Sequence, residues 1–313
     1  MATLDKVAVV GAGSVGSAVA YATTIDGLAG ETALYDIDGA RASAEALDLS
    51  HGLQFVGGGR VRGGDDIAIC AQADLVIVTA GATHGPGRTR LDLAAGNAAL
   101  IRRLLPQLLE QAPDAVYLLV SNPVDVVTYV AQEISGLPQG RVIGSGTVLD
   151  SSRLRHLLAE RLGVAVTSVH AMVVGEHGDS EVVLWSSATV GGTPLLDVVG
   201  AEGERITADE LDAIRTHVRD AAAQIIRGKG NTNLAIGLAT ARIARAISRD
   251  EHAVLPVSVR TDVPGVGDVC LSLPSVVGRE GVLTSLSTPL DDAEREGLRA
   301  SAAALRAVID AVD

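Results

Sequence analysis

Residues 175–179, Gly-Glu-His-Gly-Asp, are the segment of this sequence best suited to chemistry. The neighbouring glycines leave the His177 imidazole unhindered, and an imidazole exchanges protons near neutral pH. Upstream, Asp150 can fix the tautomer of that ring. Arg153 and Arg90, on separate segments, can bind a carboxylate and polarise a carbonyl. Together these residues suit the transfer of a proton in step with a hydride.

A glycine-rich segment near the start of the chain is the candidate dinucleotide site. Residues 11–16, Gly-Ala-Gly-Ser-Val-Gly, have GxGxxG spacing, follow an apolar run and precede a helical pattern that lasts to about Asp26. Such glycines let the backbone turn and approach a pyrophosphate at a helix N-terminus. Asp36, twenty residues after Gly16, can bind ribose hydroxyls and repel a 2′-phosphate, which favours NAD over NADP. The alternative is a glycine turn in a Rossmann domain that binds another ligand. The expected cofactor-binding residues are Gly11, Gly13, Ser14, Val15, Gly16, Asp36, Ala80, Gly81 and Asn122.

The elements that must position these residues alternate in the first half of the chain. Short apolar runs, each followed by a longer helical pattern, occur at 6–10, 33–35, 75–79, 116–120 and 142–143. This alternation predicts an α/β fold with a Rossmann-type doubly wound parallel sheet. Ligands on such sheets bind at the carboxyl ends of the strands. The small and polar residues that end these runs therefore mark the expected site.

The pattern changes after about residue 149. Strand-like runs occur at 169–174, 182–185, 254–260, 269–273 and 282–286, and helical stretches occur at 208–227, 233–248 and 291–312. We therefore expect an NAD-binding Rossmann domain over residues 1–148 and a mixed α+β catalytic domain over residues 149–313.

Composition narrows the class of protein. The 313 residues are 47% hydrophobic but only 2% aromatic, so the core must consist of Val, Leu, Ile and Ala. A formal net charge of −13 argues against binding to nucleic acid or to an anionic membrane. Cys70 and Cys270 form neither a disulfide framework nor a metal-binding spacing, so no metal is expected. The chain begins close to its first strand and has no apolar run of transmembrane length, which indicates a cytoplasmic protein.

Along essentially its full length the chain resembles the L-lactate/malate dehydrogenase family, and its bacterial L-lactate members in particular. The segments that carry the resemblance are VVGAGSVGSAVAY, YDID, AGATHGPGRTRLDL, SNPVD, GSGTVLDSSRLRHLL, SVHAMVVGEHGDSEVVLWSS and KGNTNLAIG. GEHGDSE and SNPVD in this order are specific. The resemblance implies an NAD-dependent enzyme of glycolysis and fermentation that interconverts pyruvate and L-lactate.

The resemblance also implies a role for each candidate residue. His177 would be the acid/base, Asp150 would orient its ring, and Arg153 would hold the substrate carboxylate in a bidentate contact. Arg90 would polarise the carbonyl group. Asn122 would hydrogen-bond the reacting oxygen or the carboxamide region, and Thr232 would line the wall of the pocket for the substrate side chain. Taken singly, Arg90 could be a solvated residue at a helix start, and Thr232 could simply begin a helix.

The segment before Arg90 departs from the family. Residues 83–87, Thr-His-Gly-Pro-Gly, could act as a lid, and His84 occupies the position where lactate enzymes carry Gln and malate enzymes carry Arg. A neutral His84 cannot pair the second carboxylate of oxaloacetate, whereas its imidazolium can in part. Arg88 is expected to point to solvent. We predict a preference for pyruvate at neutral pH, with oxaloacetate improving below about pH 6.5. The alternative is a malate dehydrogenase or another L-2-hydroxy-acid dehydrogenase.

Arg155 and His170 indicate a second, allosteric site. Arg155 lies two residues beyond Arg153, a rotation of roughly 200° on a helix, so the two side chains face opposite ways. If residues 169–175 form one strand, His170 and His177 also face opposite ways. In similar bacterial enzymes this pair binds fructose 1,6-bisphosphate at a two-fold interface, which implies an allosteric homotetramer. The alternative is a surface arginine and a packed histidine.

Two rival classes make different demands on the second half of the chain. A Rossmann protein that senses NAD without catalysis has no need of Asp150, Arg153 and His177, and a purely structural protein has no use for their convergence. The complete set of these residues favours an enzyme.

Overall fold

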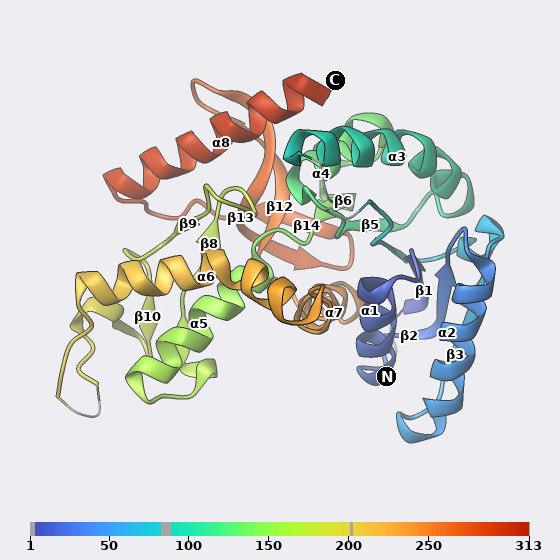
Figure 1. Ribbon diagram of the computed structural model, residues 1–313, viewed down its shortest axis with the longest axis horizontal. Coiled ribbons are helices and arrows are strands. Elements are labelled where there is room, and N and C mark those ends of the chain that lie inside the picture. The colour runs from blue at the N-terminus through green and yellow to red at the C-terminus, as the bar shows by residue number, and fades with distance from the viewer. Residues whose placement is uncertain (1–3, 83–88, 201–202, 313) are drawn as a thin grey trace.

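The computed structural model describes residues 4–82, 89–200 and 203–312, and a nine-stranded sheet forms its centre (Figure 1). Six parallel strands run in the order β3-β2-β1-β4-β5-β6, and β12, β13 and β14 extend the sheet with antiparallel pairing. The parallel strands are β1 (Leu4–Val10), β2 (Ala29–Tyr35), β3 (Arg60–Gly64), β4 (Leu75–Val78), β5 (Val116–Leu119) and β6 (Val142–Gly144). The antiparallel ones are β12 (Ala253–Val263), β13 (Gly267–Gly278) and β14 (Gly281–Ser285).

Helices cover both faces of the parallel part. The α-helices of the described residues are α1 (Ser14–Ile25), α2 (Gly39–Gly52), α3 (Arg90–Gln111), α4 (Val124–Ser135), α5 (Val148–Leu162), α6 (Ala208–Lys229), α7 (Leu234–Ser248) and α8 (Asp292–Val312). Because side chains alternate along a strand, β1 sends Val7 and Val9 into one core and Ala8 and Val10 into another. The first core includes residues of α1 and α7, and the second includes residues of α3 and α4.

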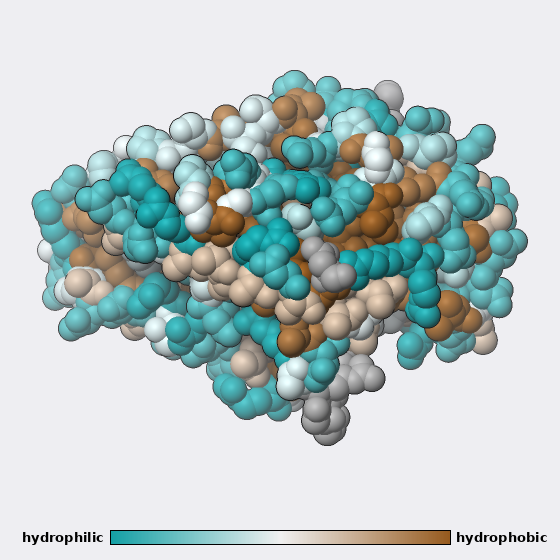
Figure 2. Space-filling model, turned by 90° about the horizontal axis from the view of Figure 1, so that it is seen from above, coloured by the Kyte–Doolittle hydropathy of each residue, from teal (hydrophilic) through white to brown (hydrophobic). Residues whose placement is uncertain are grey.

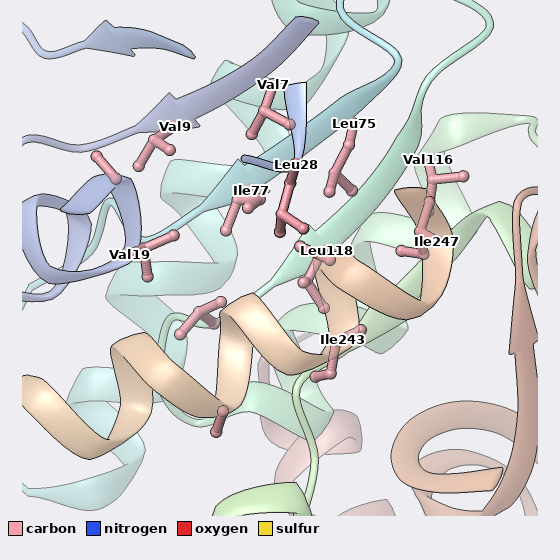
Figure 3. Close-up of a cluster of buried hydrophobic side chains, with 14 of the residues drawn as sticks. Val7, Val9, Val19, Leu28, Leu75, Ile77, Val116, Leu118, Ile243 and Ile247 are labelled. Atoms are coloured by element: carbon pink, nitrogen blue, oxygen red, sulfur yellow. The ribbon is translucent and has the colours of Figure 1, made fainter. Parts of the chain in front are cut away.

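Helix α7 ties the second half of the chain to the Rossmann sheet. Figure 3 shows Ile243 and Ile247 beside Leu118 of β5, in the cluster that also contains Val7 and Ile77. All five of these side chains are fully buried. The end of the helix that begins next to Thr232 therefore rests on the sheet that carries the glycine turn.

The predicted α/β doubly wound fold is confirmed, and the five predicted parallel strands form. Strand β3 was not predicted, because its sequence, Arg-Val-Arg-Gly-Gly, has Val61 as its one buried residue at the edge of the sheet. The strand-like runs at 254–260, 269–273 and 282–286 lie in β12, β13 and β14, which join the main sheet.

The single strand expected at residues 169–174 is wrong. Two short strands form instead, β7 (Val169–His170) and β8 (Val173–Val174), and they belong to different sheets. β7 pairs with β10 (Thr189–Val190), which in turn pairs with β11 (Thr193–Pro194), whereas β8 pairs with β9 (Val182–Val183). The chain changes sheets between His170 and Val173, so strand periodicity cannot relate His170 to His177.

Hydrophilic residues cover much of the face shown in Figure 2, interrupted by hydrophobic patches. No helix within the described ranges is long and apolar enough to cross a membrane. The same ranges contain no cluster of three or more His, Cys, Asp or Glu side chains that could hold a metal ion. Cys70 and Cys270 are both buried free thiols.

Candidate active site

The glycine turn between β1 and α1 requires its first and last glycines. Gly11 has φ +100°, and a Cβ there would lie 2.8 Å from the Ala80 nitrogen. A Cβ on Gly16 would lie 1.8 Å from the Gly11 carbonyl oxygen. A Cβ on Gly13 would meet no atom within 4 Å. Gly11 and Gly16 therefore close the turn, and Gly13 leaves open space at the N-terminus of α1.

The residues around this turn fit a dinucleotide. Helix α1 has neither a side-chain cap nor an acidic residue in its first turn, so its N-terminal N–H groups suit a pyrophosphate. A cavity of about 440 Å³ adjoins the turn, and we call it the cofactor cavity. Its wall includes Ser14, Val15, Thr79, Gly81, Ala82, Leu93, Val120, Ser121, Asn122, Ile226, Gly230, Asn231 and Thr232. Gly11 and Gly16 lie against Thr79 of this wall, and Gly11 also lies against Ala80.

Asp36, at the end of β2, is held by the turn itself. Its Oδ2 accepts the Ala12 N–H at 2.6 Å, and its Oδ1 accepts the Asp38 N–H at 2.9 Å. The carboxylate is thereby fixed next to the glycine turn, where ribose hydroxyls of a dinucleotide are expected.

A second cavity, of about 430 Å³, brings the predicted catalytic residues together, and we call it the catalytic cavity. Arg90, Asp150, Arg153 and His177 all line it, although they come from three separate segments. Leu93, Asn122 and Ile226 line both cavities, so the two adjoin. The further lining residues are Pro123, Gly178, Asp179, Glu181, Arg219, Ala222 and Ala223.

Asp150 joins His177 to Arg153. One carboxylate oxygen lies 2.6 Å from His177 Nδ1, and the other accepts a hydrogen bond from Arg153 at 2.8 Å. Asp150 and Arg153 lie three residues apart in the first turns of α5, so one helix face carries both. The Nδ1 contact leaves Nε2 of His177 as the nitrogen that can serve a substrate.

Electrostatics keep His177 and Asp150 ionised. The Asp150 carboxylate raises the pKa of His177 to about 9, although burial opposes the imidazolium. Burial also opposes the charge of Asp150, but the positive charges of His177 and Arg153 outweigh it and lower the pKa of that carboxyl. At neutral pH the imidazolium is therefore ready to donate a proton.

Three further elements hold the backbone around His177. Asp125 of α4 accepts the His177 N–H at 2.8 Å, and Ser301 of α8 accepts the Glu176 N–H at 2.7 Å. Gly175 and Ser272 of β13 exchange two backbone hydrogen bonds, of 2.9 and 2.8 Å. On the α5 side, Ser151 accepts the Val173 N–H at 2.9 Å. These contacts set the position of the ring relative to Asp150.

Arg90, the first residue of α3, faces the same loop. Its guanidinium donates to Asp179 at 2.8 Å and to Glu176 at 2.5 Å. Thr89 caps the helix through a capping box with Asp92, which fixes the direction in which Arg90 leaves α3. The cation is thus anchored at the cavity with its side chain 43% exposed.

The remaining predicted residues lie in different places. Asn122 lies at the junction of the two cavities, whereas Thr232 lies on the cofactor cavity. His84 and Arg88 are outside the described residues. Arg155 turns away from the Asp150 contact and donates to the Ala171 carbonyl at 2.8 Å, and His170, the neighbour of Ala171, is exposed. Burial and the charge of Arg242 lower the pKa of Arg155.

Several site residues were not predicted. Glu176 and Glu181 belong to the GEHGDSE motif and Asp125 to SNPVD, so the motifs contained them without indicating a role. Arg219 and Ile226 lie on α6, where nothing in their spacing distinguishes them from the solvated face of an amphipathic helix. These two residues reach the catalytic cavity because α6 lies beside α5, as Figure 1 shows.

Comparison with known proteins agrees with this geometry. Residues 5–144 match the family described as lactate/malate dehydrogenase, NAD binding domain, and residues 147–313 match its alpha/beta C-terminal domain. The chain is 49% identical over 311 residues to an L-lactate dehydrogenase of Synechococcus sp. (strain JA-3-3Ab), covering 98% of this chain and 99% of that protein. It is 47% identical over 303 residues to an L-lactate dehydrogenase of Bifidobacterium animalis subsp. lactis (strain AD011), covering 96% and 95%.

Solved structures give the same result. The crystal structure of the minor L-lactate dehydrogenase from Enterococcus mundtii in its ligands-bound form superposes with a TM-score of 0.94 at 39% identity, covering 99% of each chain. With matches across both halves, the glycine turn, the Asp150–His177 pair and the arginines have one common explanation: the chain belongs to the lactate/malate dehydrogenase family.

Proposed function

We propose that this protein is an NAD-dependent L-lactate dehydrogenase that reversibly reduces pyruvate to L-lactate. The observation that carries the proposal is the Arg153–Asp150–His177 arrangement, with contacts of 2.8 and 2.6 Å, in a cavity that adjoins the cofactor cavity. The match of residues 5–144 to an NAD binding domain and the names of the relatives support it.

Each residue has a distinct task in this reaction. Bound NADH supplies the hydride. Arg153 binds the substrate carboxylate through its planar guanidinium, which places the carbonyl near His177. His177 donates the proton on Nε2 to the carbonyl oxygen and takes it back in the reverse direction. Asp150 keeps Nδ1 protonated, and Arg90 polarises the carbonyl. Asn122, at the junction of the cavities, contacts the reacting oxygen or the carboxamide, and Thr232 borders the substrate side chain.

Substrate choice rests on His84. We propose a pyruvate preference at neutral pH and a relative gain for oxaloacetate below about pH 6.5, because imidazolium can partly pair a second carboxylate. The names of the L-lactate dehydrogenase relatives favour pyruvate over the malate alternative.

NADH oxidation with pyruvate, oxaloacetate and a longer 2-oxo acid at pH 5.5 and 7.5 tests this proposal. Pyruvate should have the highest kcat/KM at pH 7.5. His177→Asn should lose at least about 10²-fold in kcat while still binding NADH, because the proton donor is gone. Faster turnover of oxaloacetate at pH 7.5 would make the protein a malate dehydrogenase, and full turnover in the variant would remove His177 from the mechanism.

We also propose a homotetramer activated by fructose 1,6-bisphosphate at Arg155 and His170. The hydrogen bond from Arg155 to the residue next to His170 and the exposure of that histidine support a shared site. Adding the sugar bisphosphate to the same assays should raise activity at low pyruvate. An unchanged rate and an unchanged mass in light scattering would refute this part.

Two further proposals concern organisation and location. We propose that residues 1–148 and 149–313 act as the NAD-binding and catalytic domains, and that the protein is cytoplasmic. Cell fractionation tests the second of these directly.

A further inference from the structure

Glu181 is a carboxylate in the catalytic cavity that the reaction described above does not use. It lies just before β9 and lines the cavity together with Arg153, His177 and Arg219. Its Oε1 is buried and has no hydrogen-bond partner among the residues that the structure describes. Asp150 differs, because both of its oxygens are bonded. A buried carboxylate oxygen without a donor is costly when the group is ionised.

Charged groups from four segments line the same cavity as Glu181 or contact groups that do. Asp150 and Arg153 belong to α5, Arg219 to α6, Arg90 to α3, and the loop from Gly175 to Ser180 contributes His177, Asp179 and Glu176. The cations among them already face other carboxylates. Arg153 and His177 share Asp150, Arg219 donates to Asp220, and Arg90 donates to Glu176 and Asp179.

Burial is the main influence on the pKa of Glu181. Together with the charge of Asp150 it raises the pKa of Glu181 to about 8, while His177, Arg153 and Arg219 oppose the shift. A substrate carboxylate on Arg153 adds another negative charge to the same cavity and draws on the cation that partly stabilises ionised Glu181. Binding of substrate therefore favours the neutral form of this side chain.

We propose that Glu181 is a substrate-binding residue that must be protonated for a 2-oxo monocarboxylate to bind, so that in alkaline solution binding takes up a proton at Glu181 in addition to the one that His177 carries. The proton comes from solvent, adds to a Glu181 carboxylate oxygen, and returns to solvent when the product leaves. This inference rests on the proposed 2-oxo acid substrate and deepens it.

The test measures binding of oxamate, an unreactive isostere of pyruvate, to the enzyme–NADH complex between pH 7 and pH 9. In the wild type two groups lose protons over this range, and the Kd should rise roughly 20-fold. In Glu181→Gln only His177 titrates, so the Kd should rise only a few-fold, even though loss of the Glu181 charge also lowers the pKa of His177. Glu110→Gln, the same change at an exposed position in the last turn of α3, should behave as the wild type.

A rise of equal size in Glu181→Gln and wild type would overturn the inference. A second measurement needs no variant: titration calorimetry of oxamate at about pH 9.5 in buffers with different ionisation enthalpies counts the protons taken up. More than one proton per oxamate supports a second group, and one or fewer refutes it. If the wild-type enzyme neither reduces pyruvate nor binds oxamate, the proposed function itself is wrong. If it does both and Glu181→Gln shows the same pH dependence, only the inference about Glu181 is wrong.

Discussion

Two carboxylates hold His177, and their pKa values are shifted in opposite directions. Asp150 contacts the ring and its pKa is lowered, whereas Asp125 accepts the backbone N–H and its pKa is raised to about 6, chiefly by burial. Ser258 donates to Asp125 at 2.6 Å, which only partly offsets the burial. At neutral pH Asp125 is ionised in a fully buried position, so the protein gives up stability there to hold the catalytic loop.

This balance predicts that Asp125→Asn gains stability relative to wild type as the pH rises from 4 to 7. Since the folded pKa of Asp125 lies above its unfolded value of 3.8, its protonated form favours folding below about pH 4, and ionisation removes that contribution as pH rises through 6. The free energy of unfolding of the variant, relative to wild type, should therefore increase by about 2 kcal/mol between pH 4 and pH 7. Urea denaturation at both pH values measures this.

The companion variant Ser258→Ala should act in the opposite sense. Removing the hydroxyl that stabilises the Asp125 carboxylate raises the pKa of Asp125 further, so the loss of stability with rising pH becomes larger than in the wild type. A stability difference between Asp125→Asn and wild type that stays constant with pH would contradict the account.

At the scale of elements, α8 acts as a clamp on the catalytic loop although it lies at the end of the chain. Ser301 accepts the Glu176 N–H, and Glu294 accepts both the N–H and the hydroxyl of Ser186, at 2.8 and 2.6 Å. Glu176 in turn binds Arg90. A contact on α8 therefore influences the arginine on α3 through the loop between them.

Ser301→Ala tests this clamp. The buried Glu176 N–H loses its acceptor, which should cost about 1–3 kcal/mol of unfolding free energy. Because Glu176 anchors Arg90, kcat for pyruvate should fall while the Kd for NADH stays unchanged. Ser43→Ala, at an exposed position on α2, is the matched control and should change neither quantity. A kcat equal to that of wild type would show that Arg90 does not depend on α8.

How much could be predicted from the sequence also differs between elements. The apolar runs that became β1, β4 and β5 and the helices α6, α7 and α8 have strong patterns, because their buried positions follow the period of the element. The edge strand β3 and the split at 169–174 follow from pairing with distant strands, which local periodicity does not contain. For the same reason Asp150 and His177 could be predicted from motifs, while Arg219 and Ser301 reach the site only through tertiary packing.

At the scale of the whole molecule, an apolar face lies on α1 and α7. A hollow of about 600 Å³ on this face is lined by Tyr21, Ile25, Leu234 and Leu238 among others, and Leu234 and Leu238 are 65% and 67% exposed. Apolar patches of this kind are typical of subunit contacts. By itself the net charge of −13 should make copies of the chain repel one another, whereas this apolar face favours contact between them.

Leu238→Glu tests whether this face joins subunits of the proposed homotetramer. Burying a leucine side chain contributes about 1.5–3 kcal/mol, and a carboxylate placed in an apolar contact adds a desolvation cost on each symmetric copy. Light scattering should therefore give a smaller mass for the variant than for wild type, and Leu283→Glu, at a 46% exposed position on β14, should leave the mass unchanged. Since α7 begins beside Thr232 and packs on the Rossmann sheet, loss of the contact should also weaken NADH binding. A variant that keeps the wild-type mass would mean that subunits meet elsewhere, and one that dissociates without any change in NADH affinity would separate assembly from the cofactor site.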